Sequence, residues 1–179
     1  MASSLLILGG ARSGKSRHAV AAQPRRARVV FVATAEAGDD DMAARIARHR
    51  AERPDHWTTV EEPYEVPVRV GEALTSADGV VVDCVTLWVA NLMRRVDDDE
   101  AIVKAAEALA ALGGHGRADL TLVSNEVGAG VHPPTADGIR LRDLLGRVNQ
   151  RLAAACDQVV LMVAGIPVTI KAPMGRTTA

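Results

Sequence analysis

Short runs of mainly apolar residues constrain the fold of this chain more than any other feature of its sequence. They lie at Leu5–Leu8, Val29–Val32, Val80–Val82, Leu120–Val123 and Val159–Val163, with a weaker candidate at Trp57–Val60. Runs of this length, without regular polar alternation, are typical of strands that are covered on both faces, as in parallel sheets. The sequence therefore predicts a buried and mostly parallel sheet.

Helical patterns separate these runs. They are Ser16–Ala22, Asp40–Arg53, Val66–Leu74, Leu87–Arg94, Ile102–Leu112 and Ile139–Ala155, with loops at 35–39, 113–118 and 125–137. Alternation of strands and helices predicts an α/β fold with right-handed crossovers. Because 179 residues suit one domain, we expect a single domain over residues 1–171 and a frayed tail over 172–179.

A glycine-rich loop follows the first apolar run and has the pattern G-x-x-x-x-G-K-S. Its residues are Gly9, Gly10, Ala11, Arg12, Ser13, Gly14, Lys15 and Ser16. Between a strand and a helix, such a loop cradles phosphate oxygens with its backbone N–H groups. Lys15 is then placed to reach the β- and γ-phosphates, and the Ser16 hydroxyl to bind Mg²⁺. These features predict a three-layer α/β fold of the P-loop NTPase type.

Asp83 directly follows the run Val80–Val82. A carboxylate at the carboxyl end of a central strand is where P-loop enzymes hold Mg²⁺, directly or through water. A strand-end aspartate also commonly caps the following helix. Both interpretations remain open at this point, and they do not exclude each other.

The composition excludes several classes of function. The formal net charge is −1 and the aromatic content is 2%, which gives no reason to expect a nucleic-acid partner or base-stacking platforms. No apolar run reaches the ~18 residues of a membrane span, and the first is too short for a signal peptide. Cys84 and Cys156 lie in apolar settings and are expected to be buried free thiols. We therefore expect a cytoplasmic protein.

The predicted helix over Asp40–Arg53 carries a histidine beside arginines. Met42, Arg45, Ile46, His49 and Arg53 fall on one side of it by i+3 and i+4 steps. Composition alone favours a solvated arginine helix with an incidental histidine.

Nine sequence blocks together resemble one family, the bifunctional adenosylcobinamide kinase/adenosylcobinamide-phosphate guanylyltransferases of cobalamin biosynthesis. The blocks are G-G-A-R-S-G-K-S-R (9–17), A-T-A (33–35), D-x-D-M (39–42), R-I-x-x-H-R-x-x-R-P (45–54), W-x-T-x-E-x-P (57–63), D-C-x-T-L-W-x-x-N-L (83–92), S-N-E-V-G-x-G-x-x-P (124–133), G-R-V-N-Q-x-L-A (146–153) and G-I-P-x-x-I-K (165–171). They cover nearly the whole chain in the family's order. The histidine block and the N-E-V-G block are the most specific.

The resemblance implies roles for individual residues. His49 corresponds to the histidine that the family guanylylates, and Lys15 to the phosphate-loop lysine of the kinase step. Nucleotide contacts are implied at the loop residues 9–16 and at Thr34, Arg53, Glu62 and Asp83, with Ser16 and Asp83 as metal ligands. Arg45, Arg50 and Arg53 are weaker candidates for balancing the charge of the triphosphate. Apart from the resemblance, Asn125 and Glu126 lie on a glycine-rich loop after a strand, where open α/β sheets bind ligands. Glu126 is equally a candidate for capping its own loop.

The resemblance also implies two reactions. A nucleoside triphosphate, ATP or GTP, phosphorylates the hydroxyl group of adenosylcobinamide with Mg²⁺, and GMP from GTP then passes through His49 to the cobinamide phosphate. It further implies a homotrimer. Two alternatives remain: a P-loop small-molecule kinase with a single activity, and a nucleotide-sensing module that acts through a partner.

Overall fold

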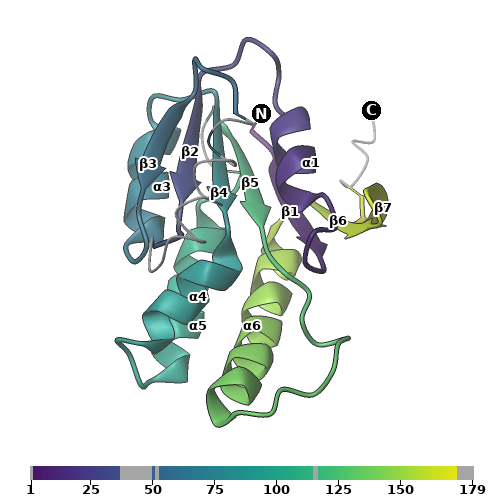
Figure 1. Cartoon of the computed structure of the whole chain (residues 1–179). Coiled ribbons are helices and arrows are strands. Elements are labelled where there is room, and N and C mark those ends of the chain that lie inside the picture. Colours follow the sequence, from purple (N-terminus) through teal and green to yellow (C-terminus); the bar gives the residue numbers. More distant parts are fainter. Residues whose placement is uncertain (1, 37–49, 51–52, 115–116, 173–179) are drawn as a thin grey trace, which may run out of the picture.

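The computed structural model of the chain describes residues 2–36, 50, 53–114 and 117–172. The described strands are β1 (Ser4–Gly9), β2 (Val29–Ala33), β3 (Thr58–Glu61), β4 (Gly79–Asp83), β5 (Asp119–Val123), β6 (Gln158–Val163) and β7 (Ile166–Lys171). They form one sheet in the order β3-β2-β4-β5-β1-β6-β7 (Figure 1). Neighbouring strands from β3 to β6 run parallel, and β7 runs antiparallel to β6.

Helices cover both faces of this sheet. They are α1 (Lys15–Ala21), α3 (Val66–Leu74), α4 (Val85–Met93), α5 (Asp99–Ala111) and α6 (Ala136–Ala155). The larger apolar cluster joins one face of the sheet to α3, α4, α5 and α6. The smaller cluster joins the other face to α1. We call these two sides the α6 face and the α1 face. The prediction of a three-layer α/β fold is confirmed.

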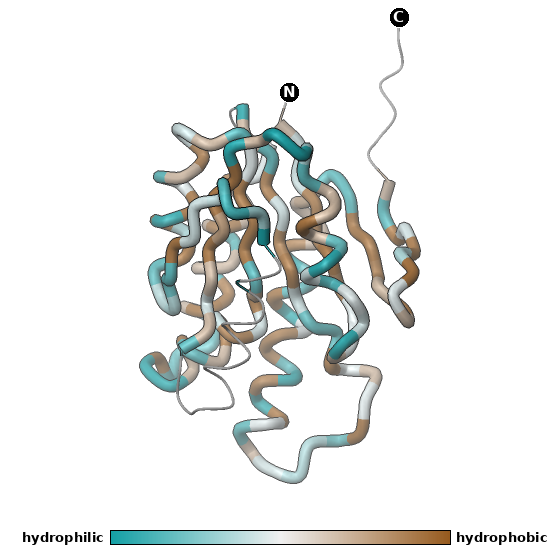
Figure 2. Tube along the Cα trace, turned by 45° about the horizontal axis from the view of Figure 1, so that its top comes forward, coloured by the Kyte–Doolittle hydropathy of each residue, from teal (hydrophilic) through white to brown (hydrophobic). Residues whose placement is uncertain are grey.

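Alternation along the strands explains why both faces are apolar. On β1, Leu6 and Leu8 belong to the cluster of the α6 face, whereas Ile7 belongs to the cluster of the α1 face. On β4, Val80 and Val82 belong to the cluster of the α6 face, and Val81 belongs to the cluster of the α1 face. Successive side chains of a strand point to opposite faces, so a strand covered on both sides is apolar at every position. Figure 2 shows the resulting apolar residues along the central strands.

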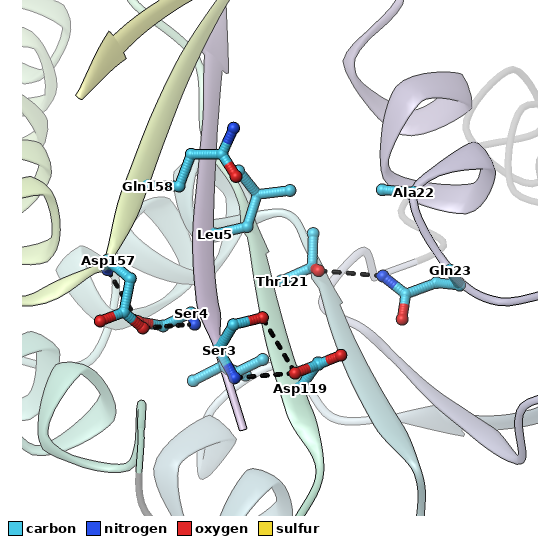
Figure 3. Close-up of a pocket in the computed structure, with 10 residues that line it drawn as sticks. Ser3, Ser4, Leu5, Ala22, Gln23, Asp119, Thr121, Asp157 and Gln158 are labelled. Carbon is cyan, nitrogen blue, oxygen red and sulfur yellow. Dashed lines mark hydrogen bonds between the residues drawn. The ribbon is translucent and has the colours of Figure 1, made fainter. Parts of the chain in front are cut away.

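Serine–aspartate bonds fix the strands at the edge of the sheet where β1 begins (Figure 3). Asp119 Oδ1 accepts hydrogen bonds from the Ser3 backbone N–H, at 2.7 Å, and from the Ser3 hydroxyl, at 2.9 Å. Asp157 Oδ2 accepts from the N–H and the hydroxyl of Ser4, at 2.8 and 2.7 Å. These bonds tie β1 to the starts of β5 and β6. They set the register that aligns the opposite, carboxyl ends of the same strands.

The described helices agree with the predicted ones to within two residues, except at the starts of α5 and α6. We expected helices from Ile102 and Ile139, but α5 begins at Asp99 and α6 at Ala136. The reason is capping: Asp98 accepts a hydrogen bond from the N–H of Glu100, and Thr135 from that of Gly138. The expected helix over Asp40–Arg53 and the frayed tail fall largely on residues 37–49, 51–52 and 173–179, which lie outside the described residues.

Strand β7 is the element that the sequence prediction missed. It pairs with β6 through a two-residue turn, Ala164–Gly165, in which both residues have positive φ angles, 50° and 82°. Its proline, Pro167, is compatible with a strand because β7 is at the edge of the sheet. Lys171 ends the strand and donates hydrogen bonds to the carbonyl groups of Ala153, Ala154 and Cys156, at the end of α6.

Candidate functional site

The glycine-rich loop connects the carboxyl end of β1 to the first turn of α1. Gly14 is the N-cap of α1 in a left-handed conformation, with φ of 95°, and makes no side-chain cap bond. Glycine supplies no side-chain cap, so the first turn of α1 can turn its N–H groups to a ligand. Lys15 is buried, with 8% of its surface exposed, and its Nζ donates a 2.7 Å hydrogen bond to the Gly10 carbonyl. This bond folds the lysine back over its own loop.

Gly9 is required by close packing at the start of the loop. Its φ is +152°, and a Cβ there would lie 2.6 Å from Ser13 Oγ and 2.7 Å from the Met162 carbonyl oxygen. Ser13 Oγ is itself buried and has no hydrogen-bond partner among the described residues. A buried polar atom without a hydrogen-bond partner costs about 1–3 kcal/mol of folding free energy. This hydroxyl is therefore suited to bond with a polar ligand held by the glycine-rich loop.

The β6–β7 turn supports the loop from the side. Gly165 donates its N–H to the Ser13 carbonyl at 3.0 Å. Its Cα would lie 3.4 Å from a Cβ placed on Gly14, which shows how closely the two segments approach. The edge hairpin is therefore part of the loop's framework.

Asp83 ends β4, and β5 separates that strand from the strand of the phosphate loop. Two strand spacings place the ends of β4 and β1 about 10 Å apart at the same edge of the sheet. The N-cap of α4 is Cys84, so capping of this helix is not the role of Asp83. No hydrogen bond or ion pair with another described residue engages its side chain. The carboxylate stays available to a ligand from the α1 face.

Thr34 joins the end of β2 to the end of β4. Its hydroxyl donates to the Cys84 carbonyl at 2.7 Å and accepts from the Cys84 N–H at 2.8 Å. Its backbone N–H donates to the Asp83 carbonyl, and its carbonyl accepts from the Asn91 side chain. These bonds position Asp83 from the neighbouring strand. A direct nucleotide contact by Thr34 stays a prediction.

Arg53 lies over β2 and β3 on the α1 face. Its guanidinium carbon is 3.6 Å from the centre of the Phe31 ring, and one terminal nitrogen donates to the Thr59 hydroxyl at 3.1 Å. Its Nε is buried without a partner among the described residues. Burial lowers the pKa of this guanidinium, and the Asp83 carboxylate partly offsets the shift. The site thus holds a cation near its carboxylate.

Glu62 occupies the turn between β3 and α3. Its Oε1 accepts from the N–H groups of Tyr64, at 3.0 Å, and Glu65, at 2.9 Å, and Arg69 donates to Oε2 at 3.4 Å. Burial raises the pKa of this carboxyl, but the bonds from Glu65, Tyr64 and Arg69 outweigh it and leave the pKa below its usual value. Glu62 is therefore an anion that orders this turn, and its predicted nucleotide contact remains a prediction.

A network of buried polar side chains fixes the strand end after β5. Ser124 donates its hydroxyl to Asn149 Oδ1 at 2.7 Å, and Asn149 Nδ2 donates to the Asn125 carbonyl at 3.0 Å. Thr86 accepts from the Asn125 N–H at 2.8 Å. No role was expected for Thr86 or Asn149 from the sequence. The sequence did contain an indication of their roles. Each is a polar residue on an otherwise apolar helix face, which predicts a buried hydrogen bond.

Glu126 turns back on its own loop. Its Oε1 accepts a 3.1 Å hydrogen bond from the Gly128 N–H. This bond supports the capping interpretation of Glu126 over a ligand role. The two cysteines are free, as expected, and burial raises the pKa of both Cys84 and Cys156 to about 11. Neither thiol is therefore a nucleophile near neutral pH.

His49 lies outside the described residues, as do Arg45, Met42 and Ile46, so its predicted catalytic role stays a prediction. Arg50 is described and pairs with Glu61 at the end of β3, with 3.8 Å between nitrogen and oxygen. This exposed pair, together with Arg53, places both ends of the segment 50–53 beside the α1 face.

The described residues hold no group of three or more His, Cys, Asp or Glu side chains arranged to bind a metal ion. Mg²⁺ needs no such group, because it takes one or two protein oxygens and completes its shell with phosphates and water. Ser16, in the first turn of α1, and Asp83 fit that pattern. None of the described helices is long and apolar enough to cross a membrane.

Comparison with known proteins decides the family. Residues 5–170 match the model of the family described as "Cobinamide kinase / cobinamide phosphate guanyltransferase". The chain belongs to this family. The kinase/guanyltransferase match runs from the second residue of β1 to the last residue but one of β7.

Individual relatives agree with this family. The chain is 40% identical to the bifunctional adenosylcobalamin biosynthesis protein CobU of Escherichia coli, over 93% of this chain and 99% of the relative. It is 44% identical to the bifunctional protein CobP of Pseudomonas aeruginosa, over 93% and 96% of the two chains. The corresponding CobU of Salmonella typhimurium is 40% identical over 93% and 99%.

Solved structures support the fold alone. A KaiC-like protein from Pyrococcus horikoshii superposes with a TM-score of 0.56 at 14% identity, over 97% of this chain and 81% of that one. An ATPase of a bacterial type III secretion system superposes with a TM-score of 0.56 at 11% identity, over 89% and 50%. These likenesses agree with the P-loop NTPase-type fold predicted from the glycine-rich loop.

Proposed function

We propose that this protein is a bifunctional enzyme that phosphorylates adenosylcobinamide with a nucleoside triphosphate and then transfers GMP from GTP to the product. Family membership supports both activities. The main support from the structure is that the phosphate loop and the Asp83 carboxylate lie at the same edge of the sheet. The product of the two steps is adenosylcobinamide-GDP.

In the kinase step, the hydroxyl oxygen of cobinamide attacks the γ-phosphorus and the nucleoside diphosphate leaves. The loop N–H groups and Lys15 hold the β- and γ-phosphates and offset the charge that spreads over their oxygens. Positioning and charge stabilisation supply the rate, because little covalent work falls to the protein in phosphoryl transfer. Mg²⁺, when bound by Ser16 and Asp83, would neutralise further phosphate charge.

In the guanylyl step, a neutral imidazole nitrogen of His49 attacks the α-phosphorus of GTP and pyrophosphate leaves. The new P–N bond holds GMP until a phosphate oxygen of cobinamide phosphate attacks the same phosphorus and frees the histidine. Histidine suits this role because its neutral nitrogen is available near pH 7. Arg53 supports the step as a half-buried cation on the same face as Asp83.

Radioactive labelling separates this proposal from its two alternatives. GTP labelled at the α-phosphate should mark the protein covalently, through a bond that is labile in acid and stable in base. A kinase with a single activity would phosphorylate cobinamide without such a label. A nucleotide-sensing module would bind nucleotide and show neither the label nor kinase turnover.

We also propose that the protein is a cytoplasmic homotrimer. The family resemblance supports the trimer, and the edge strand β7 offers a surface for it. Ile166, Val168 and Ile170 of this strand are apolar and exposed, as is Val163 of β6, which pairs with Ile166; between 47% and 65% of each residue's surface is exposed. Edge strands with apolar faces associate readily, so we expect another copy of the chain to bury these residues. Light scattering should give the mass of three chains, and Val168→Lys should lower it.

A further inference from the structure

The end of strand β5 occupies a special position in the sheet. β5 lies between β1, which carries the phosphate loop, and β4, which carries Asp83. Ile7, Val123 and Asp83 are level across the three strands. Any side chain that extends beyond Val123 on the correct face therefore stands between the loop and the carboxylate.

Asn125 is that side chain, because strand geometry continues past the end of β5. The N–H of Ser124 donates to the Ile7 carbonyl at 2.9 Å, and the N–H of Glu126 donates to the Gly9 carbonyl at 3.0 Å. These bonds repeat every second residue, as in a parallel ladder. Asn125 is thus level with Gly9, one strand spacing of about 4.8 Å away.

The same geometry gives the direction of the Asn125 side chain. Val123 belongs to the apolar cluster of the α1 face, whereas the Ser124 hydroxyl bonds to Asn149 on α6, on the opposite face. Alternation then turns Asn125 to the α1 face. The phosphate loop and Asp83 serve that same face.

The backbone of Asn125 is held on both sides by buried side chains. Thr86 accepts its N–H at 2.8 Å, and Asn149 donates to its carbonyl at 3.0 Å. Thr86 and Asn149 are 7% and 5% exposed, so these bonds are shielded from water. The side-chain amide, in contrast, has no hydrogen bond with any residue in the described part of the chain. A rigid backbone with an available amide is what a ligand contact requires.

We propose that Asn125 is a further catalytic residue of the kinase step, and that its side-chain N–H donates a hydrogen bond to an oxygen of the γ-phosphoryl group. The amide supplies two N–H donors and no charge, so it can contact the γ-phosphoryl oxygens without competing for Mg²⁺. Thr86 and Asn149 are positioning residues that act through Asn125. The catalytic part of this inference rests on the proposed function, whereas the phosphate contact does not.

Nucleotide affinity tests the contact directly. Calorimetry compares β,γ-imido-ATP, which has a γ-phosphoryl group, with ADP, which lacks one, each with Mg²⁺. Asn125→Ala should weaken binding of the triphosphate analogue about tenfold, the usual loss for a hydrogen bond to a charged group, and leave ADP within twofold. Asn125→Asp keeps the shape but replaces the donor with a negative charge, and should weaken the analogue further.

Glu126→Ala is the matched control, because Glu126 is the next residue of the same strand end and faces the other way. It should leave both affinities within twofold. Kinase assays should show a fall in kcat of about a hundredfold for Asn125→Ala at an unchanged KM for cobinamide. The proposal is overturned if both Asn125 variants keep the wild-type ratio of analogue affinity to ADP affinity. It is also overturned if Glu126→Ala changes this ratio as much as Asn125→Ala does. Failure of the proposed function is a separate result, since the wild type would then bind nucleotide without phosphorylating cobinamide.

Discussion

Replacing Gly9 with alanine tests the geometry of the phosphate loop most sharply. The added Cβ would lie 2.6 Å from Ser13 Oγ, 2.7 Å from the Met162 carbonyl oxygen and 3.2 Å from Met162 Cβ. The serine hydroxyl can rotate away, but the carbonyl belongs to strand β6 and can move only with the strand. Overpacking against backbone costs about 1–3 kcal/mol.

The backbone angle adds to this cost. Gly9 has φ of +152°, a region that essentially only glycine adopts, and holding another residue there costs about 1–3 kcal/mol. The two effects overlap, because a shift of the loop relieves both. We therefore expect Gly9→Ala to lower the free energy of unfolding by about 2–4 kcal/mol. Triphosphate binding should also weaken, because the relieving shift moves the loop N–H groups.

Gly10→Ala is the matched control, since a Cβ at Gly10 meets nothing within 4 Å. Urea unfolding of the two variants and of the wild type measures the difference. Gly10→Ala should stay within about 0.5 kcal/mol of the wild type, as substitutions without a new clash usually do. Equal stability of the two variants would refute the argument that Gly9 is fixed by its approach to Met162.

Three further predictions concern single side chains. Lys15→Ala should reduce the kinase rate about a hundredfold while the thermal unfolding temperature changes little, because the lysine serves the phosphates; an unchanged rate would exclude the phosphate-loop assignment. Asp83→Asn should raise the Mg²⁺ concentration needed for half-maximal activity, whereas a variant with lower stability and the same metal dependence would contradict a metal role. The hydrogen bonds from the side chain and backbone of Arg28 lower the pKa of Asp78 from 3.8 to about 2. The stabilisation from this bond should therefore be complete above about pH 4 and decline as the pH falls towards 2, and Asp78→Asn should remove that part of the pH dependence in acid unfolding curves.

The sheet was predictable because its buried strands are marked in the sequence by runs of consecutive apolar residues. Val80–Val82 and Val159–Met162 are apolar at consecutive positions, which only a strand covered on both faces requires. β7 was missed for the opposite reason. Ile166, Val168 and Ile170 alternate with Pro167 and Thr169, and most of the strand is exposed, so no continuous buried run marks it.

The site was predictable where a motif requires one backbone conformation, as at Gly9 and Lys15. It was less predictable where a polar residue serves another residue's backbone. Thr34 was expected to contact nucleotide, yet both hydrogen-bonding roles of its hydroxyl are used on Cys84. Thr86 and Asn149 lie far from Asn125 in the sequence, so their joint hold on it depends on how α4 and α6 pack. Such long-range partners cannot be read from local spacing.

The proposed passage of GMP through His49 can be tested by covalent labelling of the protein. The wild type, incubated with Mg²⁺ and GTP labelled at the α-phosphate, should acquire a label that peptide mapping places on His49. His49→Ala should acquire none and should keep most of the kinase rate, since the phosphate loop belongs to β1 and α1. A label on another residue, such as His18, or an undiminished label in His49→Ala, would show that His49 does not carry the GMP.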